Sequence, residues 1–307
     1  MEKIQSAIAK ARAAREGQIP PPAVSPPPAA AVSALAAGPA VTVMPAPAPA
    51  PAPAAPEAAA TAADPAAVTA AWAALPAFVP NAPLMVRNRI VAFDARSPDA
   101  VSFDVMRTRI LQQMRANNWR RLAVTSPTAG CGKSMIVLNL GFSLARQTDQ
   151  RTIVAELDLR RPTLAKTLGL KMPQKFADVL AGTARFEDHA VRHSENLCFA
   201  TNHAAVGNPA ELLGGSTIGP ALADIEARYD PALILFDMPP MLVSDDVMAF
   251  MGQVDCVLLV AAAETSTIKE IDTCERDLAS QTNVMGVILN KCRYVERSYG
   301  YGYGSYG

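Results

Sequence analysis

The groups best suited to chemistry lie in residues 126–134, which read Ser-Pro-Thr-Ala-Gly-Cys-Gly-Lys-Ser. Gly130 and Gly132 allow backbone N–H groups to close around phosphate oxygens, and Lys133 adds a positive charge beside the β- and γ-phosphates. The hydroxyl of Ser134 is a suitable ligand for Mg²⁺. The segment therefore predicts a loop that binds the phosphates of a nucleotide.

The surroundings of this segment support the prediction. An apolar run at 122–124 precedes it and a helical pattern follows it, which is the strand–loop–helix context of a phosphate-binding loop. The usual first glycine is replaced by Pro127, so the strict motif fails at one position. The residues expected to contact the nucleotide are Thr128, Ala129, Gly130, Cys131, Gly132, Lys133, Ser134 and Met135.

Acidic side chains stand at the ends of two further apolar segments. Residues 152–157 and 232–237 read as short buried strands, the first leading to Glu156 and Asp158 and the second ending at Asp237. Parallel sheets bind ligands at the carboxyl ends of their strands, where carboxylates suit Mg²⁺. Asp158 and Asp237 could instead cap the turns that follow, which prolines mark. The predicted metal ligands are Ser134, Asp158 and Asp237.

Alternating helical and strand patterns predict the elements that would position this site. Together they indicate an α/β fold with a doubly wound, mostly parallel sheet of the P-loop NTPase type. The helical patterns cover 98–117, 134–147, 244–252 and 265–281, and the apolar strands cover 121–125, 152–157, 197–201, 232–237, 255–261 and 283–289.

Composition divides the chain into four parts, predicted as 1–16, 17–85, 86–290 and 291–307. The first reads as a short amphipathic helix, suited to docking on a partner or an anionic membrane, or else a frayed terminus. The second holds most of the 26 prolines and almost no charge, which predicts a disordered, partly polyproline-like linker. The third is the globular domain, and the fourth is a flexible Tyr/Gly tail.

The overall composition limits the environment and the partners. A formal net charge of zero gives no electrostatic reason to expect nucleic acid as a partner. The sequence has neither a signal peptide nor a stretch of about 18 apolar residues, so we expect a cytoplasmic protein. Five cysteines without metal-type spacing fit a reducing compartment, with Cys131 in the loop expected to be accessible.

The last fourteen residues hold five of the six tyrosines, separated mostly by glycine. Such phenols are not core residues. They belong either to a low-complexity segment that self-associates or, given the phosphate-binding loop upstream, to acceptors of a phosphoryl group. The candidate acceptors are Tyr294, Tyr299, Tyr301, Tyr303 and Tyr306.

With these elements in this order, residues 88–307 resemble the bacterial tyrosine autokinases of capsule and exopolysaccharide synthesis, the BY-kinases. The matching motifs are TSPTAGCGKS, VAELDLRRP, NPAELL, ILFDMPP, GVILNK and the terminal tyrosine cluster. The resemblance implies an ATP- and Mg²⁺-dependent protein-tyrosine kinase that phosphorylates its own tail and regulates polysaccharide polymerisation and export. It also implies a membrane-anchored chain-length or co-polymerase activator, which would recruit the kinase to the inner face of the cell membrane.

The resemblance also assigns roles to residues. Lys133 and Ser134 would bind phosphate and Mg²⁺, Arg160 would lie near the transferred phosphate, and Asn290 near the base. Either Glu156 or Asp158 would take the proton of the acceptor phenol, and both remain open. The implied catalytic set is Lys133, Glu156, Asp158, Arg160 and Asp237.

Three departures from the family pattern bear on these roles. Glu156 stands where the family usually has Asp, which predicts lower activity. The family's assembly motif Glu-x-x-Arg-x-x-Arg aligns with Val101, Asp104 and Arg107, so we expect a mostly monomeric chain that forms no ring by the usual contacts. Some relatives are fused to a two-span membrane activator, so here that activator is expected to be a separate protein.

Two other functions fit the same loop. One is an ATPase that positions septa, plasmids or protein complexes, but such proteins carry a second lysine five residues before the main one, where this chain has Thr128. The other is a scaffold that binds nucleotide without catalysis. The position of Thr128 and the tyrosine tail both favour the kinase.

Overall fold

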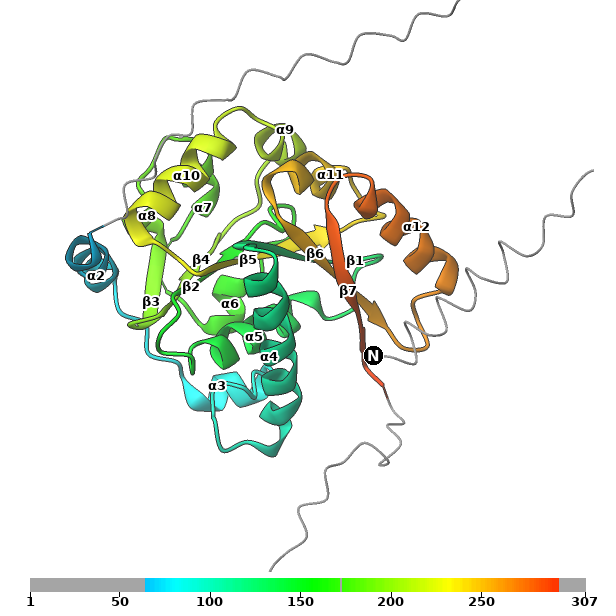
Figure 1. Cartoon of the computed structure of the whole chain (residues 1–307), viewed down its shortest axis with the longest axis horizontal. Helices are drawn as coiled ribbons and strands as arrows, with labels where there is room; N and C mark the ends of the chain where they lie inside the picture. Colours follow the sequence, from blue (N-terminus) through cyan, green and yellow to red (C-terminus); the bar gives the residue numbers. More distant parts are fainter. Residues whose placement is uncertain (1–63, 172, 293–307) are drawn as a thin grey trace, which may run out of the picture. The chain divides into compact units, whose positions relative to one another are not determined.

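A seven-stranded sheet forms the centre of the computed structural model, which describes residues 64–171 and 173–292 (Figure 1). The strand order is β3-β4-β2-β5-β1-β6-β7, and all neighbours pair in parallel except β3 and β4. The predicted fold class is confirmed. The strands are β1 (Arg121–Ser126), β2 (Thr152–Glu156), β3 (Ala190–Ser194), β4 (Leu197–Ala200), β5 (Leu233–Pro240), β6 (Cys256–Ala262) and β7 (Asn283–Asn290).

Six of these strands lie where apolar runs predicted them, and β3 was missed. Its sequence, Ala-Val-Arg-His-Ser, buries only its first two residues, so it lacks the continuous apolar run of a buried parallel strand. β3 lies at the edge of the sheet and pairs antiparallel with β4 through a tight turn.

Helices cover both faces of the sheet, and each face has its own apolar core. Figure 1 shows α4 and α5 on one side of the sheet and α10, α11 and α12 on the other. Successive residues of β5 belong to opposite cores: Leu233 and Leu235 pack with α5, whereas Ile234 and Phe236 pack with α10 and α11. The helices of the first side are α3 (Ala82–Arg87), α4 (Val101–Ala116), α5 (Lys133–Leu144) and α6 (Leu164–Leu168).

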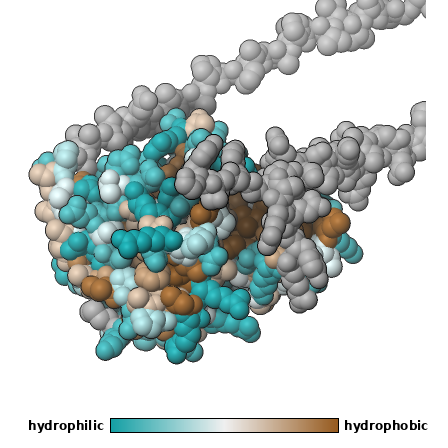
Figure 2. Space-filling view, turned by 90° about the horizontal axis from the view of Figure 1, so that it is seen from below, coloured by the Kyte–Doolittle hydropathy of each residue, from teal (hydrophilic) through white to brown (hydrophobic). Residues whose placement is uncertain are grey.

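The second core includes buried side chains from α2 (Pro65–Ala74), α7 (Phe176–Leu180), α8 (Phe186–His189), α9 (Pro209–Leu213), α10 (Ile218–Tyr229), α11 (Asp246–Phe250) and α12 (Ile268–Ala279). Short 3₁₀ helices occupy Pro98–Ala100 and Met251–Gln253. The helix α10 was not predicted, although its apolar residues recur at helical spacing and four of them are buried. On the face seen in Figure 2, the surface is largely hydrophilic and apolar residues form separate patches.

Residues 64–92, here called the N-terminal strap, correct the predicted domain boundary. Residues 64–85 were assigned to the disordered linker, but they form α2 and α3 and pack on the sheet. Trp72 is buried in the core on one face of the sheet and Met85 in the core on the other, so the strap passes around the β3 edge. The predicted helix at 1–16 and the rest of the linker, to residue 63, lie outside the described residues.

Specific contacts hold the strap in place. The indole Nε1 of Trp72 donates to the carbonyl of Tyr229 at 2.8 Å, and the two rings meet edge to face. At the sheet edge, the N–H of Phe78 donates to the carbonyl of Arg192 at 2.7 Å, which gives the exposed edge of β3 a partner. A Pro/Ala composition does not reveal these contacts, because they depend on residues more than a hundred positions away.

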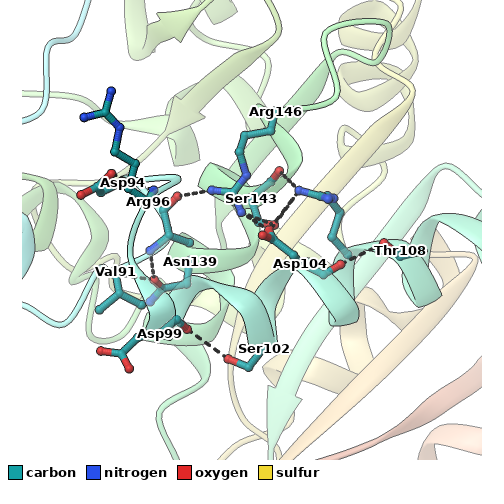
Figure 3. A network of polar contacts seen from close by, with 12 residues as sticks. Val91, Asp94, Arg96, Asp99, Ser102, Asp104, Thr108, Asn139, Ser143 and Arg146 are labelled. Atoms are coloured by element: carbon teal, nitrogen blue, oxygen red, sulfur yellow. Dashed lines mark hydrogen bonds and ion pairs between the residues drawn. The ribbon is translucent and has the colours of Figure 1, made fainter. Parts of the chain in front are cut away.

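The strap ends on the helix that follows the phosphate-binding loop. Asn139 of α5 is fully buried, and its Oδ1 accepts the N–H groups of Val91 and Ala92 at 2.8 and 2.9 Å. Its Nδ2 donates to the carbonyls of Arg89 and Met135. Figure 3 shows Asn139 of α5 beside Val91 of the strap. The strap is therefore fastened to the helix nearly two turns beyond the loop.

A second polar cluster in Figure 3 joins α4 to α5. Asp104 accepts from Arg107 at 3.0 Å, from the Ser143 hydroxyl at 2.7 Å and from Arg146. Arg107 also donates to the carbonyl of Ser143 at 2.9 Å. Two of the three positions aligned with the assembly motif thus make contacts within the chain, while Val101 is exposed.

We expect Trp72→Ala to lower the free energy of unfolding by about 3–5 kcal/mol, because it removes a buried ring and leaves the Tyr229 carbonyl without its donor. Val79→Ala is the matched control in the same strap, since Val79 is 85% exposed and should change stability by less than about 0.5 kcal/mol. Urea unfolding of the two variants beside the parent measures the difference. Equal stabilities would show that the strap does not belong to the folded core.

Candidate nucleotide site

The phosphate-binding loop connects β1 to α5 and has the backbone that its glycines permit. Gly130 and Gly132 have φ angles of 81° and 91°, values that residues other than glycine rarely adopt. A Cβ at Gly132 would also lie 2.3 Å from Nδ2 of Asn290. The helix α5 begins directly after Gly132, so its unpaired N–H groups face the loop. This is the geometry of an anion-binding helix terminus.

The segment after β5 supports the first half of the loop. The N–H of Met241 donates to the carbonyl of Ser126 at 2.8 Å, and that of Leu242 donates to Pro127 at 3.0 Å. The second contact uses the carbonyl of Pro127, so it does not require the N–H group that proline lacks. The predicted accessibility of Cys131 is wrong: its side chain is 1% exposed, with its Sγ 3.6 Å from the Ser266 hydroxyl and 3.7 Å from that of Thr128.

Lys133 is buried between two carboxylates. Its Nζ donates to Asp158 Oδ2 at 2.8 Å, lies 3.7 Å from Asp237 Oδ1, and is 3.3 Å from the hydroxyl of Ser134. Burial by itself lowers the pKa of Lys133, but the charges of Asp237 and Asp158 outweigh it and raise the pKa. The ammonium is therefore held charged at the start of α5.

The buried carboxylate of Asp237 has too few polar partners to offset its loss of water. It is fully buried, and neither of its carboxylate oxygens has a hydrogen-bond partner among the described residues. Burial raises its pKa more strongly than the nearby Lys133 lowers it. A buried carboxylate in this state requires a further cation or donor. The loop next to it has the geometry of an anion-binding site, so Asp237 and Ser134 fit a magnesium ion that is shared with a nucleotide.

Within the described residues, no three His, Cys, Asp or Glu side chains converge to hold a metal ion. Proteins commonly bind Mg²⁺ through one or two carboxylates together with substrate phosphates and water. Asp158, the third predicted ligand, is close enough to contact Lys133 and accepts the N–H of Arg161 at 3.2 Å. All three predicted ligands therefore lie around the start of α5.

The structure gives Glu156 a different set of partners from those that the family role requires. One oxygen of its fully buried carboxylate accepts the N–H groups of Thr163 and Leu164 at 2.5 and 2.7 Å, and the other accepts that of Asn202 at 2.8 Å. Burial raises its pKa to about 7, against these hydrogen bonds. Glu156 thus joins β2 to the start of α6 and to the residues after β4.

Arg160 follows β2 and Asn290 ends β7, so the two residues come from opposite sides of β1 in the strand order. The guanidinium of Arg160 forms two hydrogen bonds with the fully buried Asp246, at 2.6 and 2.9 Å. Asn290, the last residue of β7, donates from Nδ2 to the carbonyl of Cys131 at 2.8 Å. Asn290 therefore touches the loop backbone, which the motif alone did not indicate. The five candidate acceptor tyrosines lie outside the described residues.

Asp246 was not among the predicted site residues. It lies nine residues after Asp237, in a Ser-Asp-Asp run that reads as a helix start, and nothing in that run separates the buried Asp246 from the exposed Asp245. The resemblance placed Arg160 near the transferred phosphate without assigning it an acidic partner. A search for that partner could have identified Asp246.

Comparisons with known proteins agree with this geometry. Residues 122–298 match the family model described as the CobQ/CobB/MinD/ParA nucleotide binding domain. The tyrosine-protein kinase wzc of Salmonella typhi is 31% identical over 179 residues, which are 58% of this chain and 24% of that protein. The kinase domain of the Escherichia coli tyrosine kinase ETK has a TM-score of 0.60 at 26% identity, over 69% of this chain and 84% of that one. The kinase domain of VpsO has a TM-score of 0.56 at 29% identity, over 63% and 96%.

These matches confirm the predicted resemblance to the bacterial tyrosine kinases. The chain spans about a quarter of the length of wzc. It covers most of the length of the ETK and VpsO kinase domains. No helix within residues 64–171 and 173–292 has both the length and the apolar character needed to cross a bilayer.

We expect Glu156→Gln to destabilise the fold by about 1–3 kcal/mol, because the new amide NH₂ faces backbone donors where an oxygen accepted them. Glu195→Gln, in the exposed turn between β3 and β4, is the control for loss of a carboxylate. Thermal unfolding measures both variants. A Glu156→Gln protein as stable as the control would mean that the three backbone contacts do not hold this junction together.

Proposed function

Because this chain belongs to the CobQ/CobB/MinD/ParA nucleotide-binding family, we propose that it uses ATP to phosphorylate tyrosine residues, first of all those near its own C-terminus. The names of its relatives and structural neighbours support a tyrosine kinase. The buried Lys133 between Asp158 and Asp237 supports chemistry on phosphates. The proposal includes Mg²⁺ at Ser134, Asp158 and Asp237.

The observation that carries the proposal is where the tail begins. The last residue of β7, Asn290, is hydrogen-bonded to the phosphate-binding loop, and Tyr294 follows only four residues later. Four residues span at most about 14 Å, and the sixteen residues to Tyr306 span at most about 55 Å. The acceptor tyrosines are thus tethered beside the loop, so they are available to this site or to that of a second copy.

The residues of the site have separable tasks in this reaction. The N–H groups at the start of α5 and the ammonium of Lys133 hold the phosphates and compensate the charge that spreads over them during transfer. The phenol oxygen forms a bond to the γ-phosphorus while the bond from that phosphorus to the bridging oxygen breaks. When bound, Mg²⁺ would supply further positive charge at the β- and γ-phosphates.

Asp158 is the acid that the geometry favours for the phenol proton. Its Oδ2 accepts from Lys133, and it becomes available when the phosphates take Lys133 as their partner. The oxygens of Glu156 are already occupied by three backbone N–H groups. The proton of the phenol therefore passes to an oxygen of Asp158, and Glu156 holds the segment that carries Asp158.

The relatives' names also suggest the setting. We place the chain in capsule or exopolysaccharide synthesis, regulating polymerisation and export, in the cytoplasm at the inner face of the membrane. A membrane-anchored co-polymerase would recruit and activate it. In favour of an external activator, Asp104 and Arg107 of the aligned assembly motif are engaged within the chain.

Lys133→Met should abolish tyrosine phosphorylation when the purified chain is incubated with MgATP, because it removes the buried ammonium and keeps the length of the side chain. Phosphopeptides are identified by mass spectrometry, and circular dichroism verifies the fold. Lys166→Met, an exposed lysine on α6, is the control and should match the parent. Nucleotide hydrolysis by the parent without phosphotyrosine would favour the ATPase function instead.

Replacing the five tail tyrosines together by Phe should remove nearly all phosphotyrosine and leave nucleotide affinity within about twofold of the parent, since the loop is untouched. The sixth tyrosine provides the matched control. Tyr229 is 1% exposed and its phenol contacts Glu187, so the Tyr229→Phe variant should form as much phosphotyrosine as the parent. Substantial phosphotyrosine in the five-Phe variant would contradict the tail as acceptor.

A further inference from the structure

We propose that Asp246, together with Ser244, positions the guanidinium of Arg160 for phosphoryl transfer. This inference rests on the proposed function and extends it by two residues. Nε of Arg160 donates to Asp246 Oδ2 at 2.6 Å and Nη2 donates to Oδ1 at 2.9 Å, which is the paired geometry of a bidentate arginine–carboxylate contact. The Ser244 hydroxyl donates to the same Oδ2 at 2.9 Å.

The two partners differ in exposure. Asp246 is 0% exposed, whereas the side chain of Arg160 is 44% exposed. The carboxylate is thus a fixed point inside the protein, and the guanidinium that it holds reaches the surface. The contact with Asp246 uses Nε and Nη2 of Arg160 and does not use Nη1. A long side chain held at one end in this way loses little further freedom when it meets a phosphate.

The position of this pair relative to the loop is also fixed. Residues 241–246, here called the post-β5 segment, donate N–H groups to Ser126 and Pro127 at one end and contain Ser244 and Asp246 at the other. Arg160 stands two residues after Asp158, the partner of Lys133. One segment therefore contacts both the phosphate-binding loop and Arg160, and it links the guanidinium to the loop.

Charge supports a role in orienting Arg160 rather than in binding a ligand directly. Asp246 and the nearby Asp245 both raise the pKa of Arg160, with the hydrogen bonds to Asp246 as the largest cause. Asp246 is enclosed and already paired, and a carboxylate facing the phosphates would repel them. Asp246 acts through Arg160, and it is a positioning residue.

A double-mutant cycle tests this inference. Arg160→Ala and Asp246→Asn should each lower kcat for tail phosphorylation by about tenfold or more, with KM for ATP changed by less than about threefold. In the Arg160→Ala background, Asp246→Asn should cause no further loss, because the residue through which it acts is gone. Asp245→Asn removes the exposed neighbouring acid and should leave kcat unchanged.

A spectroscopic measurement separates positioning from general stability. In the parent, the Nε–H resonance of Arg160 should be resolved and slow to exchange with water, and it should exchange rapidly in Asp246→Asn. If Asp246→Asn does not fold, Ser244→Ala should show the same direction with a smaller loss of kcat. The inference would be overturned if Asp246→Asn lowered kcat equally in the parent and in the Arg160→Ala background. It would also be overturned if Asp246→Asn kept a normal kcat while the Nε–H of Arg160 exchanged rapidly.

Failure of the proposed function would look different. The parent would then form no phosphotyrosine, and the same cycle would be measured as release of inorganic phosphate from ATP. An Arg160→Ala variant with normal rates in both assays would exclude a role for Arg160 and with it the positioning role of Asp246. A loss confined to phosphate release would retain the positioning role in an ATPase.

Discussion

The structure depends on a buried cluster of three charges, in which Lys133 lies between Asp158 and Asp237. One ammonium faces two carboxylates in a place that water scarcely reaches, and in the part of the chain that the structure describes no hydrogen-bond partner offsets the burial of Asp237. Such an arrangement costs free energy in the absence of ligand, because desolvated charges need complete compensation. In the proposed function, phosphates and a cation would supply the missing partners. The protein thus keeps a site that is better satisfied with ligand than without it.

The order of the strands brings these charges together. β2, β5 and β1 are adjacent and parallel, and Asp237 is in register with Glu156 on one side and Val124 on the other. The loop after β1 and the acids at the ends of β2 and β5 consequently reach the same edge of the sheet. Lys133 comes from the start of α5, directly after the loop. Asp158 lies in the segment between β2 and α6, which Glu156 holds by accepting N–H groups at the start of α6. The site is a product of topology as much as of motif.

The same reasoning explains what the sequence could predict. The strands that carry the site are continuous apolar runs, and their acids follow at fixed offsets, so Lys133, Asp158 and Asp237 could be placed near one another beforehand. The contacts of Glu156 could not, because a carboxylate at a strand end looks alike whether it faces a metal or backbone N–H groups. The N-terminal strap was missed for a related reason. Its order comes from Trp72 meeting Tyr229, and composition records no long-range contact.

The parts that sequence reasoning missed share one task, which is to limit movement around the loop. The strap is fastened to α5 by Asn139, and the cluster at Asp104 fastens α4 to the same helix. On the other side, the post-β5 segment holds Ser126, Pro127 and Arg160. The loop and its helix are thus held from three directions by contacts within the protein. In the proposed reaction, binding energy from the phosphates would not be needed to order this scaffold and would remain available for transfer.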